Sequence, residues 1–482
     1  MLDPRPVFYV VGLFILALGA AMAGPALVEA AHLTGKWRVF AVSAAITIFA
    51  GGAMVAACRE RRRTQLSLQQ IFLLTNLAWI GLPLFGAIPF MLGEPNARFV
   101  DAYFEAMSGM TTTGSTVFTG LETLPKGVLL WRGILQWIGG IGVIVFAMVF
   151  LPTMGVGGMQ FFRSEAFDTL GKILPRAAEI AQSIGWIYLT LTAACIFSYV
   201  AVGMTAFDAT VHAMTTIATG GFANSDASFG AYPPGAEYVG SLFMILAALP
   251  FVRYIQIVAG QVRPLFRDPQ VQAFFGIVAV ATGLLTLYLA ADSGNFRESD
   301  LREALFNSVS IMTGTGYASV DYQGWGAFPV TIIFIIGFIG ACTGSTACSI
   351  KIFRFQILAA AIMTQIRLLH SPHGVFTPRY GGRAVPEDVV SSVMSFLFFF
   401  LVGFGVVAVL LSMIGLDTIT AVSGAATAIA NIGPGLGPEI GPAGNFATLP
   451  DSAKWVLSGA MLLGRLELLA VLVLFTSAFW RG

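Results

Sequence analysis

Long apolar segments, each nearly free of charge, alternate along the chain with short stretches that hold most of its acidic and basic residues. A helix of about 20 residues crosses a bilayer core, so each apolar segment of that length is a predicted transmembrane helix. The pattern predicts ten such helices, at residues 7–28, 39–58, 71–92, 127–151, 184–203, 238–258, 271–291, 325–350, 389–414 and 454–479.

Composition supports this prediction. Hydrophobic residues make up 56% and charged residues 11% of the 482 residues, whereas a soluble domain carries about 25% charged residues. A soluble chain of this length would divide into domains with polar faces, and no such stretch is present. The net charge of +1 gives no indication of nucleic-acid binding. The four cysteines lack the spacing to histidine that a zinc site requires.

Basic residues predict the orientation. Arg59, Arg61, Arg62 and Arg63 follow the second predicted helix and indicate a cytoplasmic loop. Alternation of the helices from that point places both termini in the cytoplasm. Most other basic residues then also lie inside, and most acidic residues lie outside, where they would concentrate cations.

Four of the predicted outer connections share a pattern, in which a short helix-like stretch precedes a run rich in threonine and glycine. One such run also fits a helix C-terminus followed by a turn, but four at corresponding places indicate internal repeats. We take Gly114, Gly220, Gly316 and Gly433 as counterparts. The four runs are Thr111, Thr112, Thr113 and Gly114; Ala218, Thr219 and Gly220; Thr313, Gly314, Thr315 and Gly316; and Asn431, Ile432 and Gly433.

These runs have the chemistry of a cation filter. A cation that sheds its water needs a ring of oxygen ligands, which backbone carbonyls around a pore supply. Glycine permits the positive φ and the close approach of such a backbone, and threonine adds a hydroxyl oxygen. None of the runs contains a carboxylate. Selectivity would therefore depend on carbonyl dipoles, which argues against a calcium or sodium filter made of acidic side chains.

The predicted fold is an all-α polytopic membrane protein with four helix–pore loop–helix repeats around a pseudo-fourfold pore. Two accessory helices in residues 1–66 precede the repeats. The repeats are predicted at residues 67–160, 161–266, 267–384 and 385–482, and the third also includes an intramembrane loop and a cytoplasmic loop.

On the four Thr/Gly runs the chain resembles the Trk/Ktr/HKT superfamily of potassium transporters, and most closely its TrkH branch, the membrane subunits of bacterial Trk systems. The two helices before the repeats fit this branch better than the shorter Ktr type. The resemblance implies uptake of potassium, as substrate, across the bacterial inner membrane. It implies a homodimer in contact with membrane lipid, a cytosolic TrkA-like ring that binds NAD and adenine nucleotides, and no cofactor in this chain.

The resemblance also implies a gate in the third repeat, where the family breaks the second helix with an intramembrane loop. Here the small residues from Gly340 through Gly344 and Ser345 to Lys351 occupy that place. Residues 348 and 349 are cysteine and serine where two glycines are expected. The alternative is a closely packed helix seam.

Arg465 is the second gate candidate, since an intramembrane arginine indicates a functional site. The resemblance implies an electrostatic barrier beneath the filter. The alternative is an ion pair with Glu467 or with a carboxylate on another helix. A rival function, a secondary transporter coupled to protons or sodium, has few candidate carriers beyond Glu467 and Asp417. A membrane enzyme is not indicated, because none of the four histidines stands beside a catalytic or metal-binding group.

Overall fold

Nearly all regular structure in the protein is helical. The computed structural model describes residues 3–33, 35–59, 66–150, 154, 157–161 and 177–481. Within these residues eight helices are long and apolar enough to cross a membrane, and two sharply bent helix pairs raise the number to ten. The only strands in the described chain are β1 (Arg379–Tyr380) and β2 (Arg383–Ala384), a short antiparallel hairpin. The predicted class, a polytopic helical membrane protein, is confirmed.

Four similar units make up most of the chain, each with a first span, a short helix and a second span. The first contains α4 (Leu68–Gly86) with α5 (Ile88–Leu92), the short helix α6 (Phe99–Met110), and α7 (Lys126–Val145) with η2 (Phe146–Phe150). The second contains α10 (Ala177–Ala201), α11 (Ala206–Ile217), and α12 (Pro234–Ala248) with α13 (Phe251–Val258). The third contains α15 (Pro269–Ser293), α16 (Glu298–Met312), α17 (Ala327–Ile339) and α18 (Ile352–His370). The fourth contains α19 (Glu387–Met413), α20 (Thr418–Ala430), and α22 (Asp451–Arg465) with α23 (Leu469–Leu472).

Short helical turns connect these elements or end the chain. They are η1 (Leu121–Thr123), η3 (Ser228–Ala231), α14 (Arg263–Phe266), η4 (Tyr322–Trp325), α21 (Gly437–Ile440), η5 (Val473–Phe475) and α24 (Ser477–Arg481).

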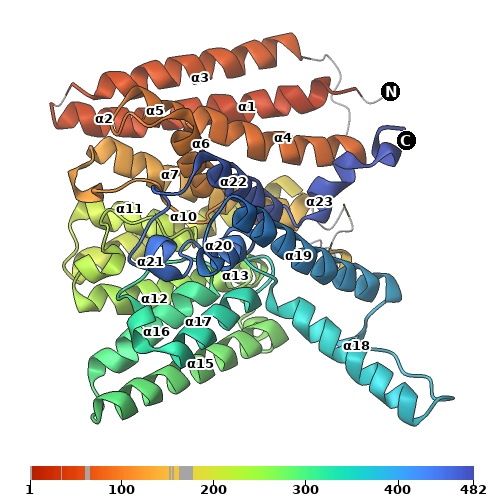
Figure 1. Ribbon diagram of the computed structural model, residues 1–482. Coiled ribbons are helices and arrows are strands. Elements are labelled where there is room, and N and C mark those ends of the chain that lie inside the picture. The colour runs from red at the N-terminus through yellow and green to blue at the C-terminus, as the bar shows by residue number, and fades with distance from the viewer. Residues whose placement is uncertain are drawn as a thin grey trace.

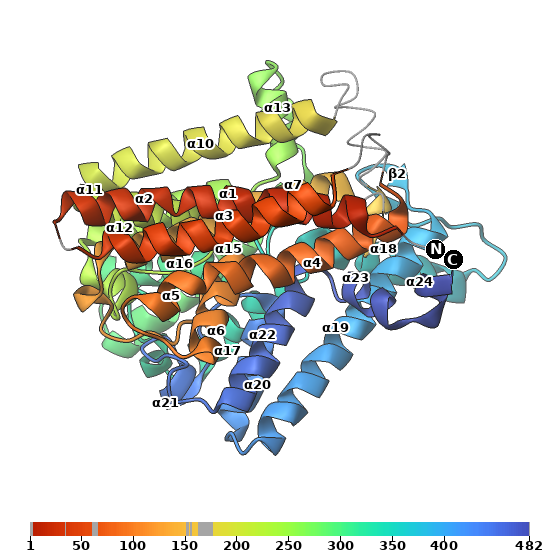
Figure 2. The same cartoon turned by 90° about the horizontal axis from the view of Figure 1, so that it is seen from above.

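The short helices α6, α11, α16 and α20 form a ring. Each packs between the two spans of its own unit and also against the second span of the preceding unit. The cross-unit contacts are α11 with α7, α16 with α12, α20 with α17, and α6 with α22. The last contact joins the fourth unit to the first, and Figures 1 and 2 show blue α22 close to brown-orange α6. The units therefore close on themselves with pseudo-fourfold symmetry.

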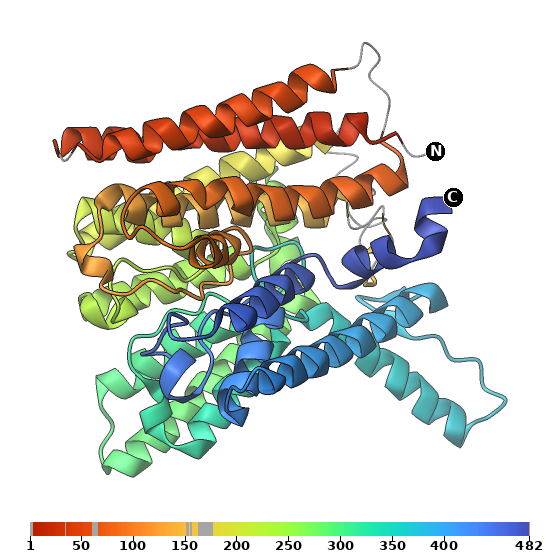
Figure 3. The same cartoon turned by 45° about the horizontal axis from the view of Figure 1, so that its top comes forward.

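The two accessory helices form a hairpin outside this ring. α1 (Arg5–Ala21) continues as α2 (Ala23–Ala31), and α3 (Trp37–Ala57) runs back beside them. The helices α1 and α3 approach each other closely at Gly12 and Gly51. A Cβ on Gly51 would lie only 2.8 Å from the Gly12 carbonyl oxygen, and small residues commonly allow such close helix packing in lipid. Figure 3 shows the hairpin at the edge of the molecule, and its contacts are with the first unit.

One predicted span is wrong in its limits, whereas the break inside it that the family resemblance implies is observed. The predicted helix 325–350 ends at Ile339, because Gly340 adopts a φ of +71° and the residues after it are irregular. α18 then begins at Ile352, where the sequence analysis expects a cytoplasmic loop. This helix is apolar enough to count among the ten candidate spans. The alternative of a continuous helix seam is therefore excluded.

Two other predicted spans are bent rather than straight. The span predicted at 238–258 turns by 88° between α12 and α13, because Leu249 is extended and a residue before proline avoids the helical conformation. The span predicted at 454–479 turns by 104° after Arg465, where Glu467 has a φ of +58°. The other seven predicted helices are confirmed, the fifth with an earlier start at Ala177.

Both ends of the chain lie at the same end of the helix bundle, as Figures 1 and 2 show. An even number of spans requires this placement. Arg61, Arg62 and Arg63, on which the predicted cytoplasmic location depends, lie outside the described residues. The side of the membrane on which the termini lie stays a prediction.

Candidate ion-conducting site

The four short helices end in the same backbone conformation. Shortly after each helix the backbone turns left-handed, with φ of 52° at Thr112, 49° at Thr219, 73° at Gly314 and 52° at Asn431. The following residue donates its N–H to the carbonyl five residues earlier, at 2.9, 2.8, 2.8 and 3.0 Å for Thr113, Gly220, Thr315 and Ile432. This is the Schellman type of helix termination. Its recurrence identifies the corresponding residues of the four repeats.

The structure corrects the predicted alignment of the second repeat. Two residues after each left-handed residue stands a glycine that also has a positive φ. These glycines are Gly114 (+88°), Gly221 (+81°), Gly316 (+83°) and Gly433 (+109°). The counterpart of Gly114 is therefore Gly221, and the prediction of Gly220 is wrong by one position. Two adjacent glycines made either choice consistent with the sequence, and only the backbone conformation distinguishes them.

The four loops meet at one place. Each glycine of this set faces a carbonyl of a neighbouring loop so closely that a Cβ would come within 3.0 Å of the oxygen. The facing oxygens are those of Gly220 at Gly114, Thr315 at Gly221, Ile432 at Gly316, and Thr113 at Gly433. Each loop contacts the next, and the fourth contacts the first. The predicted residues of all four repeats thus come together in a closed ring.

Side chains brace the ring from within. The hydroxyls of Thr111 and Thr113 lie 2.7 Å apart, and those of Thr313 and Thr315 lie 2.7 Å apart. Asn431 Nδ2 donates to Thr113 Oγ1 at 2.9 Å, so a side chain joins the fourth repeat to the first. All five of these residues are buried.

The second loop is held by a residue that the sequence analysis missed. Gln136, on α7, donates from Nε2 to the Gly220 carbonyl at 2.5 Å and accepts at Oε1 from the Phe222 N–H at 3.0 Å. A Cβ on Gly220 would come within 3.0 Å of this side chain. Both positions therefore require glycine. A side chain at 220 would collide with Gln136, and one at 221 would collide with the neighbouring loop. The sequence did offer one signal for this role, since Gln136 is a polar residue inside an apolar predicted span.

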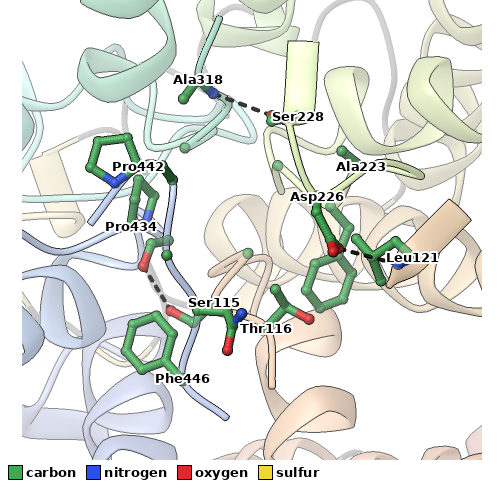
Figure 4. Close-up of a pocket in the computed structure, with 18 of the residues that line it drawn as sticks. Ser115, Thr116, Leu121, Ala223, Asp226, Ser228, Ala318, Pro434, Pro442 and Phe446 are labelled. Atoms are coloured by element: carbon green, nitrogen blue, oxygen red, sulfur yellow. Dashed lines mark hydrogen bonds between the residues drawn. The ribbon is translucent and has the colours of Figure 1, made fainter. Parts of the chain in front are cut away.

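A pocket opens on one side of the ring, the side that is predicted to face outward. Its lining includes Gly114, Gly221, Gly316 and Gly433, one residue from each loop. Figure 4 shows Ser115, whose Oγ donates to the Gly433 carbonyl at 2.8 Å. The pocket connects solvent on that side with all four loops at once. It is the mouth of the ring.

Carboxylates hold the outer loops of the first two repeats together beside this mouth. Asp226 accepts from the Leu121 N–H at 3.2 Å, as Figure 4 shows. Glu122 accepts from the Ser225 hydroxyl at 2.6 Å. The hydrogen bond from Ser225 holds the pKa of Glu122 below its ordinary value, so this carboxylate is ionised near the mouth at neutral pH.

A fully buried ion pair lies behind the same loops. Arg132 Nε is 2.7 Å from Glu105 Oε1, and their side chains are 1% and 0% exposed. Arg132 also donates to the Ala223 carbonyl at 2.8 Å, and Glu105 accepts from the Val117 N–H at 2.9 Å. The pair therefore fixes the outer segments of two repeats. The sequence analysis missed it, although two opposite charges in apolar surroundings were a signal.

The irregular segment from Gly340 to Lys351 lies on the other side of the ring, which is predicted to face the cytoplasm. Cys348 N–H donates to the Thr313 carbonyl at 3.3 Å, and Ser349 N–H donates to the Ala430 carbonyl at 3.1 Å. Both acceptors are at the ends of short helices. The predicted position of the segment, below the Thr/Gly runs, is thus observed.

The predicted gate residues are spread along this segment. Gly340 and Gly344 have φ of +71° and +73°, and Lys351 has a φ of +77°. Ser345 Oγ donates to the Cys342 carbonyl at 2.6 Å. The Gly344 carbonyl accepts from the Phe251 N–H at 2.9 Å, which connects the segment to the bend between α12 and α13.

Arg465 lies at the end of α22 and reaches the same segment, since its Nη1 is 2.6 Å from the Sγ of Cys348. Glu467 instead pairs with Arg354, Oε1 to Nη2, at 2.6 Å. The alternative in which Arg465 pairs with Glu467 is wrong. No carboxylate in the described part of the chain forms an ion pair with Arg465. Arg354, which the sequence analysis missed, also donates to the Ile350 carbonyl at 2.8 Å.

Comparison with known proteins identifies the class of protein that has this architecture. Residues 36–481 match the TrkH family, described as cation transport protein. The fold and the match together make the chain a membrane protein of the cation-transport class.

Individual relatives agree over the full length. The Trk system potassium uptake protein TrkI of Halomonas elongata is 44% identical over 478 residues, covering 99% of this chain and 97% of that protein. The protein TrkH of the same organism is 37% identical, covering 99% of each. The crystal structure of the potassium transporter TrkH from Vibrio parahaemolyticus matches with a TM-score of 0.91 and 34% identity over 100% of both chains. The chain belongs to the TrkH family.

Proposed function

We propose that the protein takes up potassium through a selectivity filter made of backbone carbonyls. The observation that carries the proposal is the closed ring, in which each loop turns a glycine toward a carbonyl of its neighbour. A dehydrated cation needs oxygen ligands from several sides, and four convergent loops can supply them. The names of the relatives, which are potassium uptake proteins and a potassium transporter, support the choice of ion.

The proposed filter contains the predicted residues with one addition. Its carbonyls and hydroxyls come from Thr111–Gly114, Ala218–Gly220 together with Gly221, Thr313–Gly316, and Asn431–Gly433. Potassium enters from the acidic mouth, loses its water in the ring and leaves toward the inner side. The membrane potential supplies the driving force, about 2.3 kcal/mol per charge per 100 mV.

The proposed gate lies directly below the filter. It consists of the segment from Gly340 through Gly344 and Ser345 to Lys351, together with Arg465. The segment blocks the inner exit by its position, and the guanidinium opposes a cation by its charge. Glycines with positive φ at Gly340 and Gly344 give the segment the backbone freedom to rearrange.

The remaining parts of the proposal rest on family resemblance. According to this proposal the protein is a homodimer in the bacterial inner membrane, surrounded by lipid, with both termini in the cytoplasm. A cytosolic TrkA-like ring that binds NAD and ATP regulates the gate from that side.

Coupled transport with protons or sodium is less well supported. The two candidate carriers are both engaged, because Glu467 pairs with Arg354 and Asp417 accepts from the Ile419 and Thr420 N–H groups as the N-cap of α20. The test is flux of potassium and sodium in liposomes containing the purified protein, with and without its cytosolic partner. Current that reverses at the potassium equilibrium potential at every pH would support uncoupled conduction, and a reversal that follows pH or sodium would refute it.

Arg465→Ala is expected to raise potassium flux. A unit charge roughly 6 Å from the ion, at an effective permittivity of about 20, opposes it by roughly 3 kcal/mol, so an increase of tenfold or more is expected. Arg465→Lys keeps the charge and is the control, with flux near that of the unaltered protein. Rubidium uptake into liposomes measures both variants. An unchanged or lower flux for correctly folded Arg465→Ala would contradict the barrier.

Asn431→Gly is expected to weaken selectivity. Glycine keeps the positive φ but removes the hydrogen bonds from Asn431 Nδ2 to Thr113 Oγ1 and to the Met461 carbonyl, each 2.9 Å long. Each bond contributes about 1 kcal/mol, so the ring loosens between its fourth and first loops. Competition of sodium with rubidium uptake should increase several-fold. Asn445→Gly, in the outer loop of the same repeat, serves as the control and should leave selectivity unchanged.

A further inference from the structure

A cavity on the inner side of the ring carries more positive than negative charge. Its lining includes Lys351, Arg354, Arg465 and Glu467. Arg354 and Glu467 form an ion pair, which leaves the charges of Lys351 and Arg465 uncompensated. Two positive charges at membrane depth are costly unless they are paired.

The guanidinium of Arg465 has donors available for a ligand. The residue is 6% exposed, and its Nε and Nη2 find no hydrogen-bond acceptor within the described parts of the chain. Only Nη1 is engaged, by the Cys348 sulfur. Two adjacent N–H donors on one edge of a guanidinium are the usual recognition element for an anion.

Lys351 is the second positive residue in the lining of this cavity. It is 8% exposed, and no carboxylate among the residues that the structure describes forms an ion pair with it. Glu467 Oε2 also lacks a hydrogen-bond partner, but this carboxylate already neutralises Arg354. Water alone could satisfy the donors, but it would leave both charges uncompensated.

We propose that a small monovalent anion, of the size of chloride, binds in this cavity between Arg465 and Lys351. The cavity has a volume of about 30 Å³, and about 10–15 Å³ is needed to hold one water. It therefore has room for one monatomic anion. Nε and Nη2 of Arg465 donate to the ion, and the Lys351 ammonium offsets its charge.

The anion reduces the local electrostatic repulsion of a passing cation. With the anion bound, the positive charge at the proposed gate falls by one unit, and the repulsion of potassium falls with it. Potassium flux should therefore be higher in chloride than in an anion too large for the cavity. This consequence for flux rests on the proposed function, whereas binding of the anion does not.

Bromide replaces chloride in the direct test, because it can be located by anomalous scattering in crystals of the full-length protein. A bromide peak in contact with Arg465 Nε and Nη2 is expected, and Arg465→Gln should abolish it. Arg253→Gln, which changes a different partly buried arginine paired with Asp268, should retain the peak. A structure of the unaltered protein in bromide without a peak at Arg465 would overturn the proposal.

Two solution measurements keep the proposal testable if a variant folds poorly. Chloride should raise the melting temperature of the unaltered protein relative to gluconate at equal ionic strength, and Lys351→Met should reduce this shift. Rubidium uptake by the unaltered protein should be several-fold higher in chloride than in gluconate. Equal melting temperatures in the two anions would overturn binding. Equal uptake despite a bromide peak would refute only the effect on flux and leave the filter untouched.

Discussion

Gly221→Ala is expected to abolish potassium uptake, with a loss of at least about 100-fold. A Cβ at this position would come within 3.0 Å of the Thr315 carbonyl oxygen, which belongs to the backbone of the next loop and cannot turn away. The φ of +81° adds about 1–2 kcal/mol of strain for any residue with a side chain. Because the ring is closed, displacement of one loop also shifts the loops on both sides of it.

Gly260→Ala is a matched control for this variant. Gly260 has nearly the same φ, +83°, but no atom lies within 4 Å of a Cβ built there. It therefore carries the same backbone strain without the collision, and its rubidium uptake should stay within a few-fold of the unaltered protein. If Gly221→Ala transports as well as Gly260→Ala, the second loop does not take part in the proposed filter.

Glu105→Leu is expected to destabilise the protein by about 3–5 kcal/mol, because removing one partner leaves the other as an unpaired buried charge. Both side chains are almost completely buried and their atoms are 2.7 Å apart. The fraction of protein that elutes as a folded species in detergent should fall sharply, and the melting temperature of the remainder should be lower.

The double variant Glu105→Leu/Arg132→Met separates loss of the pair from loss of one charge. Replacing both partners with apolar residues of similar volume is often close to neutral, so the double variant should recover much of the stability lost in the single one. It should not recover transport fully, because Arg132 also donates to the Ala223 carbonyl. A single variant as stable as the unaltered protein would show that the pair is not needed for folding.

The class of fold could be predicted because a bilayer imposes one simple requirement. A spanning helix must be apolar for about 20 residues, and seven of the ten predicted helices are observed as candidate spans, one of them with an earlier start. The three that differ are broken at Leu249, at Gly340 and near Glu467. At each break the lost helical hydrogen bonds must be replaced by contacts elsewhere in the protein, and those partners are not visible in a local sequence pattern.

The sequence predicted most residues of the candidate site, but not which residues contact one another in it. The repeated Thr/Gly runs were sufficient to locate the ring. The error at Gly220 arose because the sequence alone cannot tell which of two adjacent glycines corresponds to Gly114. The pairing of Arg354 with Glu467 and that of Glu105 with Arg132 join residues far apart in sequence. Their charges could be seen in the sequence, whereas their partners depend on how the helices cross.

The inner segment is tied to the ring through the carbonyls of Thr313 and Ala430, which accept its Cys348 and Ser349 N–H groups. Any outward swing of that segment deprives two oxygens at the base of the cage of their donors. Opening of the proposed gate would thus leave these carbonyl oxygens free to interact more strongly with an ion in the proposed filter. The affinity of the proposed filter for a cation and the opening of the segment are then thermodynamically linked. A tightly bound cation would favour the conformation in which the segment has moved away from the ring.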